Sequence, residues 1–169
     1  MNNKEERNKK IIAIVLVVAV LFLGIYKLFF DKDIYTEEKI DTETISVLKD
    51  NNRFFTVSSC VSKYVNYLSI SDTENLLVLL NEEYKEKNSI DKNNLYSYIG
   101  TINGTSTFSP KKMFEQRVSQ TVYKYYIYGY VNQEMMDEVT SRSDYYLIVF
   151  LDEKNMTFSI EPYDGSMFK

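Results

Sequence analysis

The side chains that could carry acid–base chemistry in this chain are carboxylates, because its 169 residues include no histidine. Histidine is the usual general base near neutral pH and the commonest zinc ligand, so a Ser-His-Asp triad is excluded. Glu115, Asp144 and Glu161 lie in or near the ends of predicted strands, where an acid held in a pocket can abstract a proton. A solvated surface acid is the ordinary alternative at each position. We therefore predict no catalytic residue, no cofactor and no enzyme.

Other reactive or metal-binding residues are sparse. Cys60 is the single cysteine, so no intrachain disulfide can form, and its place on an apolar helix face predicts a buried structural thiol. Glu134, Asp137 and Glu138 lie close together but lack the Asp-x-Asp-x-Asp-Gly pattern of calcium loops, so we expect a solvated loop there. The sequence also has no Gly-rich phosphate loop and no paired-cysteine spacing, and it predicts no metal site.

Tyrosine is the unusual enrichment, and five tyrosines fall in the stretch SQTVYKYYIYGYV. Side chains alternate along a strand, which places Tyr126, Tyr128 and Tyr130 on one face and Tyr123 and Tyr125 on the other. One face is expected to line the core, and the other to form an amphipathic surface suited to protein contacts, so all five tyrosines are candidates for a partner surface. Cross-strand aromatic pairs that only stabilise the sheet are the alternative, and a glycan or peptide ligand is a third.

The element that decides where these residues are located is an apolar segment, IIAIVLVVAVLFLGIYKLFF, at residues 11–30. Its twenty residues, at about 1.5 Å each in a helix, reach roughly 30 Å, the thickness of a bilayer's hydrocarbon core. Residues 1–10 carry a basic excess, so that tail is expected in the cytoplasm and the chain after Phe30 outside. A cleaved signal peptide is the alternative, but bulky residues stand where a cleavage site needs small ones. We predict an uncleaved single-pass anchor in the cell membrane.

The rest of the chain is predicted to divide into a charged stalk, residues 31–44, and one extracytoplasmic domain, residues 45–169. Residues 31–169 hold 15 basic and 22 acidic side chains, a net charge of about −7. Nucleic-acid partners are not expected, because phosphate backbones require a basic surface. The predicted partners are the membrane and other envelope or membrane proteins, with homo-oligomerisation left open.

Helices dominate the first half of the predicted domain. From Arg53 to Leu68, apolar residues recur at helical spacing, which predicts an amphipathic helix of about four turns. The capping box that begins at Ser71 predicts a second helix, which ends in the polar residues Lys85–Asn88. Its inward-facing side chains are expected to be Leu76, Leu77, Leu80 and Tyr84. A third, shorter helix is predicted from Asp91 to Gly100, a residue suited to the left-handed turn that ends helices.

Strands dominate the second half, which begins after the turn dipeptide Asn103-Gly104. Residues rich in β-branched and aromatic side chains predict antiparallel strands at Met113–Val118, Ser119–Val131, Asp144–Leu151 and Met156–Ile160. We expect a bulge at Gly129, a polar loop at Asn132–Ser143 and a short hairpin connection at Asp152–Asn155. Helices followed by strands predict an α+β domain with two or three helices packed on a curved antiparallel sheet.

Three features carry a resemblance to a known fold: the helix FFTVSSCVSKYVNYL, the capped helix that begins at Ser71, and the strand pair DYYLIVFL and MTFSI. From Ile45 to Tyr163 the chain resembles the nuclear transport factor 2-like fold, a cone in which a bent sheet wraps a long N-terminal helix. Behind a single membrane anchor, that fold is similar to the assembly subunits of type IV secretion and conjugation machines. The resemblance implies a noncatalytic scaffold, although some relatives of the fold abstract protons with a buried carboxylate.

These predictions combine into one hypothesis, a membrane-anchored protein whose extracytoplasmic domain makes protein contacts within a conjugation- or secretion-type envelope assembly. Two alternatives stay open: the interior of the cone could hold a small molecule or an active site, or the domain could bind the cell wall. A deep pocket with a buried carboxylate of raised pKa would favour the first alternative, whereas an interior filled by Tyr and Phe side chains would argue against it.

Overall fold

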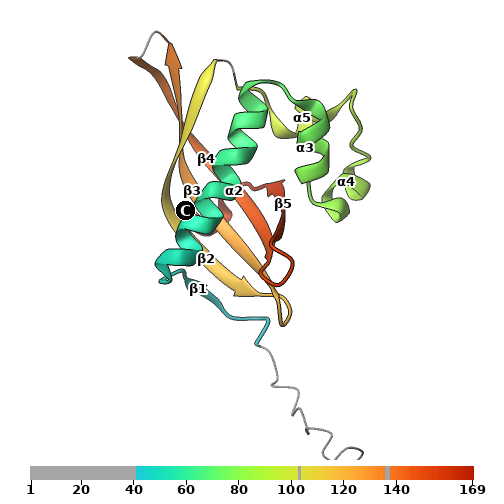
Figure 1. The fold of residues 1–169 in the computed structure, drawn as a ribbon, viewed down its shortest axis with the longest axis vertical. Helices are drawn as coiled ribbons and strands as arrows, with labels where there is room; N and C mark the ends of the chain where they lie inside the picture. Colours follow the sequence, from blue (N-terminus) through green and yellow to red (C-terminus); the bar gives the residue numbers. More distant parts are fainter. Residues whose placement is uncertain (1–40, 103, 136–137) are drawn as a thin grey trace, which may run out of the picture. The chain divides into compact units, whose positions relative to one another are not determined.

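A curved antiparallel sheet forms the frame of the structure, and its strands are arranged in the order of the sequence, β1-β2-β3-β4-β5 (Figure 1). The computed structural model describes residues 41–102, 104–135 and 138–169. The strands are β1 (Ile45–Val47), β2 (Thr105–Arg117), β3 (Val122–Met135), β4 (Glu138–Asp152) and β5 (Thr157–Pro162). Helices pack on this sheet, which confirms the predicted α+β class.

The predicted membrane anchor, residues 11–30, lies outside the described residues. So do the predicted cytoplasmic tail, residues 1–10, and residues 31–40 of the predicted stalk. Within the described part of the chain, no helix is long and apolar enough to cross a membrane. The anchor, its orientation and the extracytoplasmic location therefore stay predictions.

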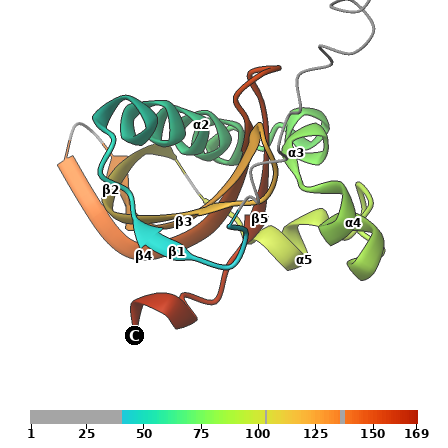
Figure 2. The ribbon, with the colours of Figure 1, turned by 90° about the horizontal axis from the view of Figure 1, so that it is seen from below.

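The long helix α2 (Asn51–Ser69) lies across one face of the sheet, which we call the inner face; the opposite face is the outer face (Figure 2). The helix begins after Asp50, whose carboxylate accepts hydrogen bonds from the N–H groups of Asn52 (2.8 Å) and Arg53 (3.1 Å). Its buried side chains form one stripe: Val57, Cys60, Val61, Tyr64, Val65 and Leu68. The predicted amphipathic helix is confirmed, and its apolar stripe packs against the sheet.

The prediction of one second helix is wrong, because the chain forms two: α3 (Thr73–Leu79) and α4 (Glu82–Asn88). The break falls at Leu80, which is extended and buried and forms a bridge to Ile160 of β5. The N–H of the next residue, Asn81, also donates to the Ile160 carbonyl at 2.8 Å. Backbone pairing with a distant strand therefore replaces the helical hydrogen bonds here, and local sequence contains no sign of it.

The capping residue of α3 also differs from the prediction. Asp72 caps the helix, and its carboxylate accepts from the Asn75 N–H at 3.1 Å. Ser71, the predicted cap, adopts a left-handed conformation with φ of 55° and lies outside the helix. The third predicted helix is present but shorter, as α5 (Leu95–Ile99), and Gly100 ends it at a φ of 74°, as expected.

The predicted loop at Asn132–Ser143 is wrong, because β3 and β4 continue through most of it as an antiparallel hairpin. Asn132 pairs with Arg142 and Gln133 with Ser141, and the Ser141 hydroxyl donates to Gln133 Oε1 at 2.8 Å. Cross-strand pairing needs backbone groups rather than apolar side chains, so polar residues extend the sheet. Glu134 and Glu138 belong to these strands, and Asp137 lies outside the described residues.

The expected bulge is present, but it lies on the neighbouring strand. The register between β2 and β3 shifts between Pro110 and Lys112, directly opposite Gly129. A Cβ atom at Gly129 would lie 2.6 Å from the Phe108 ring and 2.6 Å from the Ser109 carbonyl oxygen. Gly129 is therefore required for space, so that the ring of Phe108 can cross the backbone of β3.

Candidate functional site

The five tyrosines of β3 divide between the two faces of the sheet as strand alternation requires. Tyr125 is fully buried on the inner face, in line with the buried Ile127 and Val131, and Tyr123 shares its side. Tyr126, Tyr128 and Tyr130 lie on the outer face, away from α2. Tyr123 and Tyr125, which the sequence also offered as partner-surface residues, are therefore part of the core or its edge.

The outer tyrosines belong to a larger group of rings that we call the outer aromatic cluster. Tyr128 stacks on Tyr146 of β4 with ring centroids 5.0 Å apart, and it meets Tyr130 edge to face at 5.6 Å. Tyr126 meets Tyr163 at 5.5 Å. The complete cluster comprises Phe114, Tyr126, Tyr128, Tyr130, Tyr146, Tyr163 and Phe168. Such ring pairs contribute about 0.5–1.5 kcal/mol each beyond burial.

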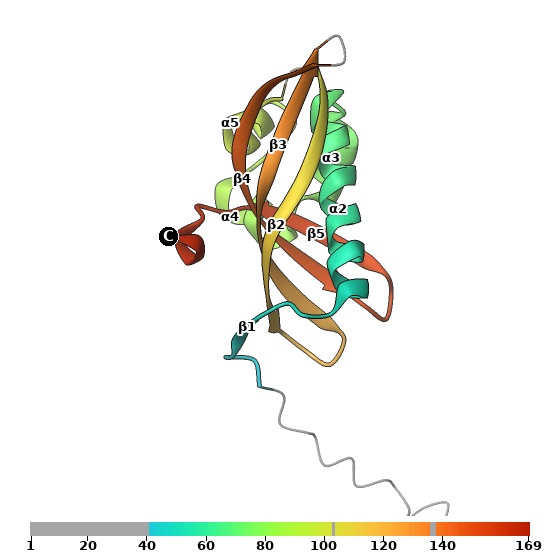
Figure 3. The same ribbon diagram turned by 90° about the vertical axis from the view of Figure 1, so that its left-hand side faces the viewer.

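The last residues of the chain complete this cluster. After β5, the C-terminal segment (Asp164–Lys169) runs to the outer face, on the side opposite α2 (Figures 2 and 3). Its short 3-10 helix η1 (Ser166–Phe168) places the Phe168 ring among four others: Phe114 (5.4 Å), Tyr128 (5.7 Å), Tyr146 (5.8 Å) and Tyr163 (6.4 Å). Gly165, at φ of 73°, lies so close to the Tyr146 ring that a Cβ there would be 2.8 Å away. The cluster is thus partly covered by the chain itself.

The C-terminal segment has a small anchor for its length. Of its six residues, Gly165 is buried, Met167 and Phe168 are half-buried, and Asp164, Ser166 and Lys169 are exposed. The rings that Phe168 contacts therefore make up most of its attachment to the strands.

Cations surround the outer aromatic cluster. Four of them lie above its rings: Lys111 above Tyr130 (5.4 Å), Lys112 above Phe114 (4.7 Å), Lys124 above Tyr126 (5.1 Å) and Arg142 above Tyr130 (3.5 Å). We call these four residues the outer cations. Each exposed cation–π contact is worth about 0.5–1 kcal/mol. The outer face therefore combines aromatic area with positive charge, although residues 31–169 are acidic as a whole.

Asp144, one of the predicted acids, lies at the edge of this surface. The Tyr128 hydroxyl donates to its carboxylate at 3.1 Å. The hydrogen bond with Tyr130 raises the pKa of Tyr128, and Asp144 adds to this effect. Asp144 is exposed and orients a tyrosine, which is the surface role that the sequence allowed as the ordinary alternative.

Glu115, the second predicted acid, belongs to an ion-pair network at the start of α2. Arg53 lies between two carboxylates, 3.3 Å from Glu115 and 2.7 Å from Glu153. Its guanidinium also lies 4.2 Å above the Tyr123 ring. The ion pair with Arg53 holds the Glu115 carboxylate in place, so Glu115 serves structure.

Tyrosines also occupy the space between α2 and the inner face of the sheet. Tyr64 and Tyr125 are both fully buried, and the hydroxyl group of Tyr64 faces that of Tyr145. Burial raises the pKa of both, and it raises the pKa of Tyr145 to about 12. The interior that the predicted cone would offer to a ligand is thus filled by aromatic rings at these positions.

Cys60 lies in the same core, as expected. Its side chain is 7% exposed, and burial raises the pKa of its thiol to about 11. A protonated, inaccessible thiol is a poor nucleophile. The prediction of a buried structural cysteine is confirmed.

Glu161, the third predicted acid, lines a groove of about 510 Å³ between α4 and the segment after β5. Tyr84, Tyr163, Glu83 and Lys87 are among its other lining residues. Burial raises the pKa of Glu161; Lys124 counteracts this effect and Glu83 adds to it. Within the described residues, no ion pair or hydrogen bond neutralises the Glu161 carboxylate, so its charge destabilises the folded state.

We predict that Glu161→Gln stabilises the protein at neutral pH. The pKa of Glu161 in the folded protein is raised above its ordinary value of 4.5. The folded protein therefore becomes less stable as pH rises through that raised pKa, because the carboxyl group must then lose its proton in an unfavourable place. The substitution should raise Tm by about 1–3 °C at pH 7 and leave it unchanged near pH 4. Thermal unfolding at both pH values measures this, with Glu86→Gln, at an exposed site on α4, as the control. Equal shifts at the two pH values would contradict the prediction.

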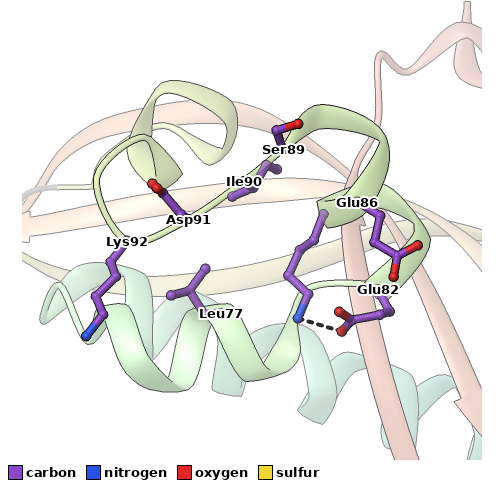
Figure 4. Close-up of a pocket in the computed structure, with 8 residues that line it drawn as sticks. Leu77, Glu82, Glu86, Ser89, Ile90, Asp91 and Lys92 are labelled. Atoms are coloured by element: carbon purple, nitrogen blue, oxygen red, sulfur yellow. Dashed lines mark ion pairs between the residues drawn. The ribbon is translucent and has the colours of Figure 1, made fainter.

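A second hollow, of about 400 Å³, lies between α3, α4 and the turn before α5 (Figure 4). Lys85 and Glu82 at its rim form an ion pair of 2.6 Å. The Asp91 carboxylate accepts from the N–H groups of Asn93 (2.7 Å) and Asn94 (3.2 Å). Three of the charged groups that line this hollow, Glu82, Lys85 and Asp91, thus already have partners, which favours a structural role.

Nothing in the described residues points to an enzyme. The three predicted acids lie at separate places, and within the described residues no group of three or more His, Cys, Asp or Glu side chains is placed to hold a metal ion. Comparison with protein-family models, with curated proteins and with solved structures yields no match. The candidate site therefore rests on the geometry of the outer face alone.

Sequence reasoning found three members of the outer aromatic cluster and missed four: Phe114, Tyr146, Tyr163 and Phe168. Tyr146 could have been found, because it alternates with buried residues in the predicted strand Asp144–Leu151. No comparable sequence pattern predicts that the C-terminal segment lies on the outer face. Phe168 in particular is placed by contacts with strands far away in the sequence.

Proposed function

We propose that this protein is a membrane-anchored, extracytoplasmic interaction module whose outer sheet face binds another protein. The outer aromatic cluster with its four outer cations is the observation that carries the proposal. Tyrosine and arginine are enriched where protein contacts are strongest, because they offer large area together with polar groups. The inner face of the sheet is covered by α2, which leaves the outer face as the broad sheet surface available to a partner.

The proposal includes the predicted setting. The basic tail and the apolar residues 11–30 support a single membrane span with the domain outside. The long helix on a curved sheet supports the likeness to the nuclear transport factor 2-like fold, and through it a scaffolding role in a secretion- or conjugation-type assembly. Protease added to intact cells tests the setting. Survival of the C-terminal domain, or a mature protein that starts beyond Phe30, would contradict it.

The contact surface is tested with full-length protein carrying an N-terminal affinity tag, purified from gently solubilised membranes. The double variant Tyr130→Ala, Arg142→Ala removes the closest cation–π pair of the outer face. We expect it to lose the stoichiometric membrane or envelope proteins that the unaltered chain recovers. Tyr98→Ala, at an exposed tyrosine on α5, is the matched control and should retain them.

Two results would contradict the proposal. One is equal recovery of partners by the double variant and the unaltered chain. The other is a full-length protein that stays monomeric and alone after gentle solubilisation. Circular dichroism of each variant separates loss of binding from loss of folding.

An interior ligand site is the competing hypothesis, and the structure offers it less support. Tyr64 and Tyr125 fill positions between α2 and the sheet that a ligand would need. Glu161 does combine a raised pKa with a groove, but the groove lies on the outer side, beside the C-terminal segment. That position makes it a neighbour of the proposed contact surface.

A further inference from the structure

The C-terminal segment occupies the surface that the proposed function needs. Phe168 lies in the outer aromatic cluster, and Gly165 lies against the ring of Tyr146. A partner that used these rings as a binding site would have to share the surface with Phe168 or remove it. The question is therefore how firmly the segment is attached.

The hydrogen bonds of the segment are made within its own turn and with the hydroxyl group of Tyr163, the cluster residue directly before it. The Ser166 N–H donates to Asp164 Oδ1 (2.9 Å), and the Phe168 N–H to the Gly165 carbonyl (2.9 Å). The Met167 N–H donates to the Tyr163 hydroxyl at 2.8 Å. Within the described residues, the Phe168 ring and the backbone of Gly165 make its contacts with the rings of the sheet. Release of the segment therefore requires the Phe168 ring to leave the cluster and the hydrogen bonds of Ser166 and Met167 with the Tyr163 hydroxyl to open.

The charge around the position of Phe168 favours a partner segment with acidic side chains. The four outer cations lie above rings of the same cluster. The segment carries one acidic side chain, Asp164, and one basic side chain, Lys169, so the four outer cations keep their positive charge when it leaves. Asp144 and Glu161 stay nearby, but the first is engaged by the Tyr128 hydroxyl and the second lies in the adjoining groove.

We propose that the C-terminal segment is a displaceable cover, and that a partner segment with an aromatic residue between acidic residues takes the place of Phe168. This inference rests on the proposed function and adds the chemistry of the partner to it. The aromatic residue would enter the position between Phe114, Tyr128 and Tyr146, and the acidic residues would pair with the outer cations.

A fluorescent reporter tests the displacement, because the chain has no tryptophan. The full-length variant Phe168→Trp places one at the position of interest. The probe is the synthetic peptide Asp-Asp-Phe-Asp-Asp, and two control peptides replace its phenylalanine by alanine or its aspartates by lysine. We expect blue-shifted, poorly quenched emission without peptide, and a red shift with greater acrylamide quenching when the acidic aromatic peptide binds. Phe55→Trp, at an exposed site on α2, is the control protein and should not respond.

Removal of the cover gives a second measurement. In fluorescence anisotropy with a labelled peptide, Phe168→Ala should bind Asp-Asp-Phe-Asp-Asp about tenfold more tightly than the unaltered chain. Both control peptides should bind about tenfold more weakly than the probe. The first lacks the aromatic ring, and the second lacks the acidic side chains. Circular dichroism confirms that the variant is folded.

The outcomes decide between the inference and the function on which it rests. A solvent-exposed tryptophan without peptide, or equal binding of the acidic and basic peptides, would overturn the inference. Loss of partners in Tyr130→Ala, Arg142→Ala without any displacement by peptide would keep the proposed function and reject the cover. Displacement by the probe together with unchanged partners in that double variant would support the cover and reject the proposed function.

Discussion

Gly129→Ala is expected to lower the free energy of unfolding by about 3 kcal/mol, near the upper end for added atoms in a packed site. The new Cβ would lie 2.6 Å from the Phe108 ring and 2.6 Å from the Ser109 carbonyl oxygen. The ring can move aside, but the carbonyl belongs to the backbone of β2 at the bulge and cannot move without breaking the register of the sheet. We therefore expect the loss to come from β2–β3 pairing.

Chemical denaturation of the full-length protein measures this loss, and Gly100→Ala is the matched control. A Cβ at Gly100 would have no atom within 4 Å, so the only cost of that substitution is the backbone strain of an alanine at a φ of 74°. We expect a loss of about 1 kcal/mol there. Equal losses at the two glycines would show that space at Gly129 is not the limiting factor. Phe108→Ala in the Gly129→Ala background should restore stability only in part, because the carbonyl contact remains.

Leu76→Ala is expected to lower the free energy of unfolding by about 2–5 kcal/mol, the range for large-to-small changes in a core. Leu76 is fully buried on α3, which packs between α2 and β5. Removing most of its side chain leaves a cavity where helix and sheet meet. The loss should appear in the same cooperative transition as that of Gly129→Ala.

The control for this prediction lies on the same helix. Val78 is 76% exposed, so Val78→Ala should change the free energy of unfolding by less than about 0.5 kcal/mol. Denaturant titration of both variants provides the comparison. A loss at Val78 as large as that at Leu76 would mean that the exposed side of α3 is covered in solution.

Much of the fold could be predicted because its cause is local. The stripe from Val57 to Leu68 repeats with the period of a helix, and that periodicity alone specifies α2 and the face it buries. Alternation along β3 likewise places Tyr126, Tyr128 and Tyr130 on the face opposite Tyr125.

The errors have non-local causes. Leu80 leaves the helix to meet Ile160, which is 80 residues away in the chain. The hairpin arm of β3 and β4 forms through backbone pairing, which polar side chains permit but do not predict. The position of Phe168 depends on rings from three strands at once, so no pattern within one stretch of sequence could predict it.

The ion pair between Arg53 and Glu153 has a consequence for how the protein is made. Its two residues are 100 positions apart, so α2 leaves the ribosome long before its partner loop exists. At about 5–20 residues per second, that gap lasts several seconds or more. During this interval the apolar stripe of the nascent helix has no sheet to cover it. Completion of the sheet must therefore be faster than association of these exposed helices with one another.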